Sequence, residues 1–163
     1  MKKLLLNTVF FFSCFMGFSQ ETLTELLDTY NTHTIPYISV EELSKLKTET
    51  IILDARERIE FNTSHIENAQ FIGYDTFKIK DVDIKDKNAQ IVVYCSLGIR
   101  SEVIAKKLKK AGFNNVLNLY GGIFEWKNKG LKVVDLNNNT TEKVHVFSKE
   151  WSKWLIKGEK VHE

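Results

Sequence analysis

Short apolar runs, each closed by a polar cluster, recur along the chain and have the length of buried strands. The run "QIVVYC" at 90–95 is the richest in β-branched residues and predicts a central strand. The other predicted strands are "TIILDAR" at 50–56, "AQFIGY" at 69–74, "NVLNL" at 115–119 and a final one, "LKVVDL", at 131–136. The polar and irregular stretch at 75–89 indicates a surface loop.

Helical patterns precede and separate these runs. Residues 20–34 predict a short leading helix, and residues 57–62 fit one or two helical turns. Ser39, followed three residues later by Glu42, forms a capping box that predicts a helix over 40–46. The first half of the chain therefore alternates helices with strands.

Two further helices are predicted in the second half. Ser101 is expected to cap a helix with apolar residues at helical spacing, which Gly112 ends. A helix that starts and ends with glycine follows at 121–130. Strands that alternate with helices imply an α/β fold, in which a central parallel sheet carries helices on both faces. The chain has 163 residues, of which 43% are hydrophobic, so one domain is expected.

Residues 137–163 are predicted to form a polar linker and an amphipathic helix. The large apolar residues of this helix stand at helical spacing and form one stripe: Phe147, Trp151, Trp154 and Leu155. We expect the helix to pack back on the domain. A helix that binds a partner or lies on a membrane surface is the alternative.

Residues 1–19 have the pattern of a secretory signal peptide. Lys2 and Lys3 precede an apolar stretch that is too short to span a bilayer, and small residues stand before a cut at Gln20. We therefore expect export to a periplasmic or extracellular location. A lipid anchor on Cys14 is the alternative, although Phe11 stands where that motif usually has leucine.

Cleavage at Gln20 would change both the net charge and the cysteine count. The number of Lys+Arg falls from 23 to 21 with the loss of Lys2 and Lys3, and then equals the 21 Asp+Glu. A neutral chain gives no support for nucleic-acid binding. Cys14 is lost as well, which leaves Cys95 as a lone thiol in an oxidising compartment. Such a thiol is either an inert buried side chain or a reactive one.

The setting of Cys95 favours a reactive thiol. Cys95 is the last residue of the predicted central strand and precedes a helix, at the carboxyl edge where open α/β sheets bind ligands. Gly98 permits a turn with positive φ, in which successive N–H groups point toward an anion. The start of the helix and Arg100 add positive charge. All of these features stabilise the thiolate, which is the nucleophilic form of cysteine.

Three segments of the chain resemble the rhodanese-like (sulfurtransferase) family. The loop "CSLGIRS" at 95–101 resembles the family's cysteine loop, and "NVLNLYGG" with a later tryptophan resembles its Gly-Gly…Trp segment. The segment at 52–69 resembles the family's Asp-x-Arg-x-x-x-Glu-Phe…His-Ile-x-x-Ala pattern. Matching positions are Asp54, Arg56, Glu60, Phe61, His65, Ile66, Ala69, Gly121, Gly122 and Trp126. The resemblance covers about residues 37–134.

This resemblance implies a rhodanese-like fold for residues 37–136, behind an N-terminal helical extension at 20–36. It implies that Cys95 takes a sulfane sulfur from a small anionic donor such as thiosulfate, and holds it as a persulfide. The sulfur then passes to a thiol or to cyanide, and no metal or organic cofactor is required. The residues expected to bind the donor are Arg100, Ser96, Leu97, Gly98, Ile99 and Ser101.

One other function remains open for a domain of this kind. A sulfur carrier, or a non-enzymatic protein-binding module, would act on a protein partner in place of a small acceptor. A phosphatase of the same fold is disfavoured, because it has arginine six positions after the cysteine, whereas Arg100 stands five positions after Cys95 and the shorter loop suits a sulfur anion better than a phosphate. The chain also departs from the family at Ser64 and Asn68, where glycine is usual.

Four polar residues of the second segment are expected to support the structure. We expect Asp54 to anchor a neighbouring loop, and Arg56 to pair with Glu60 four residues later. His65 is expected to orient the edge of the sheet through hydrogen bonds. Trp126 is expected to lie in the core.

Overall fold

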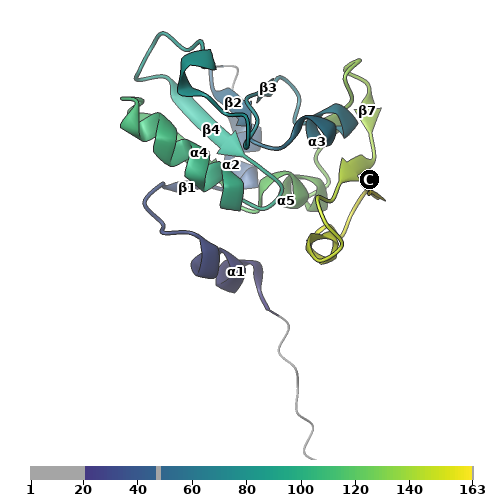
Figure 1. Ribbon diagram of the computed structural model, residues 1–163. Helices are drawn as coiled ribbons and strands as arrows, with labels where there is room; N and C mark the ends of the chain where they lie inside the picture. The colour runs from purple at the N-terminus through teal and green to yellow at the C-terminus, as the bar shows by residue number, and fades with distance from the viewer. Residues whose placement is uncertain (1–20, 47–48, 163) are drawn as a thin grey trace, which may run out of the picture.

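A central parallel sheet organises the fold (Figure 1). The computed structural model describes residues 21–46 and 49–162, so the predicted signal peptide at 1–19 and Cys14 lie outside the described residues. The sheet has the strand order β1-β5-β4-β2-β3, and every pairing in it is parallel. Its strands are β1 (Tyr37–Ile38), β2 (Ile51–Asp54), β3 (Gln70–Phe71), β4 (Gln90–Tyr94) and β5 (Asn115–Leu119). The run at 90–95 thus supplies the middle strand, as predicted, whereas β1 was not predicted.

Five of the predicted helices are present, with boundaries that differ from the predicted ones by up to four residues. They are α1 (Leu23–Tyr30), α2 (Val40–Lys45), α3 (Arg58–Thr63), α4 (Ile99–Lys110) and α5 (Gly122–Asn128). The capping box of Ser39 and Glu42 is present at the start of α2. The prediction that Ser101 caps α4 is wrong, because Gly98 occupies the cap position with a φ of +111°. Ser101 instead lies buried in the first turn of α4.

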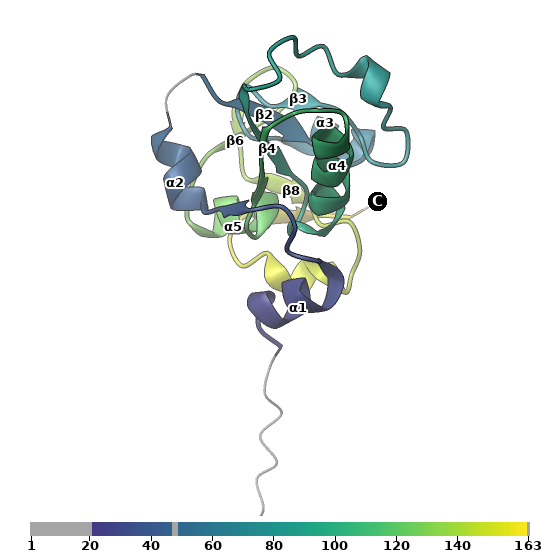
Figure 2. The ribbon, with the colours of Figure 1, turned by 90° about the vertical axis from the view of Figure 1, so that its left-hand side faces the viewer.

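Helices cover both faces of the sheet, as Figure 2 shows with α4 on one side of β4 and α2 and α5 on the other. Alternate residues of β4 enter two separate cores because successive side chains of a strand point to opposite faces. Ile91 and Val93 pack with the apolar face of α4. Val92 and Tyr94 pack with α2, α5 and the C-terminal segment. The carboxyl end of β4 therefore emerges between two packed layers.

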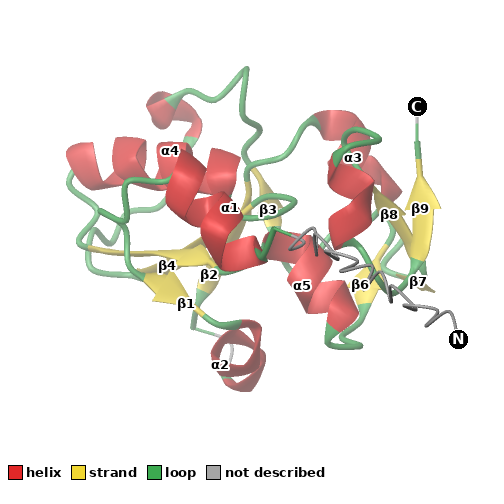
Figure 3. Cartoon of the chain, turned by 90° about the horizontal axis from the view of Figure 1, so that it is seen from below, coloured by secondary structure: helices red, strands yellow, loops and turns green. Residues whose placement is uncertain are grey.

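The remaining strands form two small sheets at one end of the molecule (Figure 3). They are β6 (Val133–Val134), β7 (Thr140–Thr141), β8 (Lys143–His145) and β9 (Glu159–Val161), and short 3₁₀ turns lie at Ile79–Asp81 and Trp151–Trp154. The predicted strand at 131–136 exists as β6, but it pairs antiparallel with β7 and lies outside the parallel sheet. It is also not the final strand.

The predicted C-terminal amphipathic helix is wrong. Residues 137–163 contain β7, β8, the Trp151–Trp154 turn and β9, and β8 pairs in parallel with β9. Phe147 has a φ of +63°, which a continuous right-handed helix excludes. The expectation that this segment packs back on the domain is confirmed, because Leu155 is fully buried in the core that also contains Val92. No helix in the described part of the chain is long and apolar enough to cross a bilayer.

Candidate active site

Main-chain hydrogen bonds from α5 hold the Cys95 loop in place. The N–H of Ile123 donates to the carbonyl of Cys95 at 2.9 Å, and the N–H of Phe124 donates to the carbonyl of Ser96 at 3.1 Å. Both donors lie in the first turn of α5, where N–H groups have no partner within the helix. A Cβ atom on Gly122 would stand 2.2 Å from the Cys95 carbonyl oxygen. Glycine at this position therefore permits the close approach of the loop to α5.

The sulfur atom of Cys95 accepts contacts from the start of α4. The Gly98 N–H donates to Sγ at 3.1 Å, and the Ser101 hydroxyl lies 3.5 Å from Sγ. Ser101 also donates to Oδ1 of Asn118 at 2.7 Å, and Asn118 Nδ2 donates to the Gly98 carbonyl at 2.8 Å. Asn31, at the end of α1, donates to the same carbonyl at 3.0 Å. The sequence analysis missed both asparagines, although Asn118 is a polar residue inside an apolar strand.

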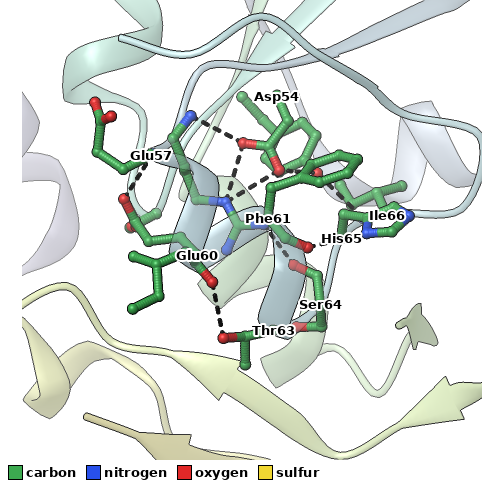
Figure 4. Close-up of polar contacts among 12 residues, drawn as sticks. Asp54, Glu57, Glu60, Phe61, Thr63, Ser64, His65 and Ile66 are labelled. Atoms are coloured by element: carbon green, nitrogen blue, oxygen red, sulfur yellow. Dashed lines mark hydrogen bonds and ion pairs between the residues drawn. The ribbon is translucent and has the colours of Figure 1, made fainter. Parts of the chain in front are cut away.

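Arg100 joins the loop to α3 through an ion pair with Glu60. Its Nη1 and Nη2 atoms each donate to a different carboxylate oxygen of Glu60 at 2.7 Å. The Ser96 hydroxyl donates to Glu60 Oε1 at 3.0 Å and accepts from Arg100 Nη2 at 3.0 Å. The Glu57 N–H completes the set by donating to Glu60 at 2.9 Å (Figure 4). The guanidinium beside the cysteine loop is thus fixed by a bidentate partner.

The prediction that Arg56 pairs with Glu60 is wrong. Arg56 binds Asp54 with Nη2 and Oδ2 2.7 Å apart, and both side chains are fully buried. Arg56 Nη2 also donates to the Ser64 carbonyl at 2.6 Å, and the Tyr94 hydroxyl donates to Asp54 at 2.6 Å. Figure 4 shows this cluster beside Glu60. Asp54 therefore fixes the ends of β2 and β4 and, through Arg56, the turn after α3.

His65 is held by main-chain hydrogen bonds and by stacking of its ring. Its N–H and carbonyl exchange two hydrogen bonds with Val134, each 2.9 Å long, and its ring stacks on Phe61 with 4.0 Å between the centroids. Among the described residues, no group of three or more His, Cys, Asp and Glu side chains is arranged to hold a metal ion. Of the two family departures, Asn68 adopts a positive φ of 63°, whereas Ser64 is extended and buried.

The environment of Cys95 changes its acidity. Burial raises the pKa of the thiol. The charge of Arg100 and the hydrogen bonds from Ser101 and Gly98 lower it by more than burial raises it, so the pKa lies below its usual value. For Glu60, burial raises the pKa, while Arg100 lowers it, and the net shift is again downward. Cys95 therefore enters its thiolate form more readily than an ordinary cysteine, while Glu60 stays ionised.

A pocket of about 90 Å³ opens next to Cys95. Five predicted site residues line it: Cys95, Ser96, Leu97, Ile99 and Arg100. The other two lining residues, Phe147 and Trp151, come from the C-terminal segment and were missed, because their place over the loop depends on tertiary packing. Gly98 and Ser101 contact the sulfur without lining the pocket. Each residue predicted for the cysteine loop thus lines the pocket or contacts the sulfur atom.

The match to a known family agrees with this geometry. The family model of the rhodanese-like domain matches residues 39–129, which is more than half of the chain. The chain belongs to the rhodanese-like domain family. The matched region contains the cysteine loop and the Glu60–Arg100 ion pair. Phe147 and Trp151 lie beyond its end.

Curated relatives of this rhodanese-like protein include tRNA uridine(34) hydroxylases. That of Yersinia enterocolitica is 32% identical over 100 residues, and that of Photorhabdus laumondii is 34% identical over 102 residues. Each match covers 57% of this chain but only 29% and 28% of the two relatives, respectively. The chain therefore spans less than a third of the length of the curated relatives it matches.

Solved structures confirm the predicted fold. A rhodanese-related protein from Thermoplasma volcanium is 26% identical with a TM-score of 0.54, over 61% of this chain and 97% of that one. A rhodanese-like domain from Anabaena sp is 25% identical with a TM-score of 0.56, over 62% and 80%. A thiosulfate sulfurtransferase from Pseudomonas aeruginosa, 24% identical with a TM-score of 0.56 over 74% and 23%, shares the fold.

Proposed function

We propose that this protein is a sulfurtransferase that carries sulfane sulfur on Cys95. The donor is a small anion such as thiosulfate, and the acceptor is a thiol or cyanide. The observation that carries the proposal is the set of groups at Sγ, where the Gly98 N–H donates at 3.1 Å, beside the backbone of Ser101 and the charge of Arg100. These groups stabilise negative charge on sulfur, both in the attacking thiolate and in the persulfide that follows.

The reaction divides into two half-reactions at one nucleophile. In the first, the Cys95 thiolate attacks the outer sulfur of thiosulfate, a new S–S bond forms, and sulfite leaves with the electron pair of the broken bond. In the second, cyanide or a thiolate attacks the outer sulfur of the persulfide, and the Cys95 thiolate is released. Since the enzyme alternates between free and persulfide forms, ping-pong kinetics are expected.

The surrounding residues have separate parts in this scheme. Arg100 adds positive charge that lowers the pKa of Cys95 against the effect of burial. Ile123 and Phe124 hold the loop carbonyls, so that the N–H of Gly98 points at the sulfur. The hydroxylase name of the curated relatives describes much longer proteins, so the chemistry of the cysteine loop is what we assign to this chain.

Mass spectrometry of the intact protein tests the proposal directly. Thiosulfate should add one sulfur atom to the wild type, and cyanide should remove it as thiocyanate. Cys95→Ser is the matched control, because it replaces the thiol with a hydroxyl of similar shape, and it should gain no sulfur. If the reduced, folded wild type gains no sulfur from thiosulfate or from an organic sulfane donor, the sulfurtransferase function is excluded.

A further inference from the structure

Two aromatic side chains from the end of the chain form a roof over the Cys95 pocket. The roof consists of Phe147 and Trp151, which line the pocket of about 90 Å³ together with the loop residues. Both residues lie outside the region that matches the rhodanese-like family model, residues 39–129. The roof is therefore a feature of this chain's own C-terminal segment.

Buried neighbours hold the roof in place. Val146 precedes Phe147, is fully buried, and its N–H donates to the Val161 carbonyl of β9 at 3.0 Å. The ring of Trp151 meets Tyr30 of α1 edge to face, with 6.1 Å between the centroids. Phe147 itself has a positive φ of 63° and is 48% exposed. The buried Val146 and the ring of Trp151 thus anchor the segment that places Phe147 at the pocket.

The pocket under this roof provides little electrostatic stabilisation for the second negative charge of a donor such as thiosulfate. Arg100 is the charged side chain among the described residues that line it, and both of its terminal nitrogens donate to Glu60. The Phe147 ring covers the guanidinium, with the carbon Cζ 4.5 Å from the ring centroid. A donor with two charges would lose water beside apolar rings and gain no unpaired cation in return.

The pocket does offer space and apolar contact to a short carbon chain. Its volume is below the roughly 150 Å³ of an engineered apolar cavity that binds benzene, so it suits a smaller group. Leu97 and Ile99 provide apolar surface on the loop side, and the roof provides it on the other side.

From these contacts we infer that Cys95 takes its sulfur from singly charged donors with a short aliphatic group, in preference to thiosulfate, and that Phe147 determines this specificity. The inference rests on the proposed sulfurtransferase function. Alkanethiosulfonates and alkyl persulfides are donors of this class. With methanethiosulfonate, the Cys95 thiolate bonds to the outer sulfur, the bond between the two donor sulfurs breaks, and methanesulfinate leaves with the electron pair. The reactants and the products each carry two negative charges, and no other reactant is needed.

The test compares kcat/KM for methanethiosulfonate and thiosulfate, with cyanide as acceptor and thiocyanate as the measured product. Each value is divided by the rate of the same donor with free cysteine, which removes differences in intrinsic reactivity. The wild type should then prefer methanethiosulfonate. Phe147→Asn should lower this preference roughly tenfold, the scale of a lost apolar contact in a binding pocket. Asparagine suits a positive φ, so the change removes the ring without adding backbone strain.

Two control variants separate the roof from general effects of the segment. Phe147→Leu keeps an apolar side chain and should retain most of the preference. Ile156→Ala changes a residue of the same segment that is 81% exposed and does not line this pocket, and it should leave the preference unchanged. An equal effect of Ile156→Ala and Phe147→Asn would contradict a specific role for Phe147.

The wild type alone provides a second test if Phe147→Asn fails to fold. Normalised kcat/KM should rise from thiosulfate to methanethiosulfonate and fall again for hexanethiosulfonate, whose chain exceeds the pocket. If thiosulfate is preferred, or if Phe147→Asn folds and keeps the wild-type preference, the inference is wrong while the sulfurtransferase function stands. If neither donor places sulfur on Cys95, the proposed function itself is wrong.

Discussion

Two ion pairs between arginine and a carboxylate lie close together in this protein, but they differ in what they face. Arg56 and Asp54 are both fully buried and contact the backbone of Ser64 and the hydroxyl of Tyr94. In the pair of Arg100 and Glu60, the arginine is 13% exposed and lines the pocket of Cys95. The same chemical pairing thus fixes strand ends in one case, and in the other it places positive charge beside the thiol of Cys95.

The difference between the two pairs shows that burial alone does not tell which arginine acts on the Cys95 thiol. The more deeply buried pair has no contact with the sulfur, whereas the partly exposed one lowers the pKa of Cys95 against the effect of burial. Matched substitutions of the two arginines therefore separate stability from reactivity.

The largest effect on stability is expected from Arg56→Met. This change leaves the Asp54 carboxylate buried without its ionic partner, and should lower the free energy of unfolding by about 3–5 kcal/mol. Urea denaturation followed by circular dichroism measures the loss. The variant that remains folded should keep a Cys95 pKa close to that of the wild type. A loss under about 1 kcal/mol would show that water or a rearranged neighbour replaces the guanidinium.

Arg100→Met should have a smaller effect on stability than Arg56→Met and a larger effect on the pKa of Cys95. Its cost in stability should be smaller, about 1–3 kcal/mol, because Arg100 is partly exposed, unlike Arg56, and water can take the place of its guanidinium beside Glu60. The main effect falls on the thiol. In the wild type, the rate of alkylation by iodoacetamide should rise with pH and level off below the ordinary pKa of cysteine. In Arg100→Met this midpoint should move upward, and an unchanged midpoint would contradict the electrostatic role of Arg100.

The same pKa shift gives a pH dependence of stability with a definite sign. Folding lowers the pKa of Cys95, so the thiolate binds its proton less tightly in the folded protein than in the unfolded one. Its contribution to the free energy of unfolding is therefore present above the unfolded pKa and is lost as the pH falls through the folded pKa. Urea denaturation at a series of pH values should show this in the wild type and less of it in Arg100→Met. An equal slope in both proteins would contradict the assignment.

Ser96→Ala should give the smallest effect and sharpens the comparison within the second pair. It removes one hydroxyl but leaves both hydrogen bonds between Arg100 and Glu60, so the loss should be about 0.5–1.5 kcal/mol. Since the charge of Arg100 stays in place, the alkylation midpoint of Cys95 should change less than in Arg100→Met. A shift as large as that in Arg100→Met would assign the effect to the hydroxyl.

The sequence predicted the cysteine loop well because its determinants are local. The strand before Cys95, the positive φ of Gly98 and the helix that follows lie within one continuous segment. The partner of Glu60 was predicted wrongly, because helical spacing shows which residues are near on a helix but not which distant loop approaches them. Arg100 reaches Glu60 from 40 positions away.

The prediction for the C-terminal segment was wrong for a related reason. Its large apolar residues have helical spacing, but polar and apolar residues also alternate from Lys143 to Val146, and β8 pairs with β9. Tertiary pairing decided between these two patterns. The place of Phe147 and Trp151 over Cys95 follows from that pairing, so no local pattern indicated it.

The hydrogen bonds from α5 to the carbonyls of Cys95 and Ser96 have a consequence for the order of events during protein synthesis. The ribosome synthesises Cys95 before Ile123 and Phe124. The thiol therefore emerges from the ribosome before the two N–H groups that hold the Cys95 loop. A nascent chain that ends ahead of α5 carries the thiol without this main-chain support. The carbonyls of Cys95 and Ser96 therefore obtain these main-chain donors only after α5 has been synthesised.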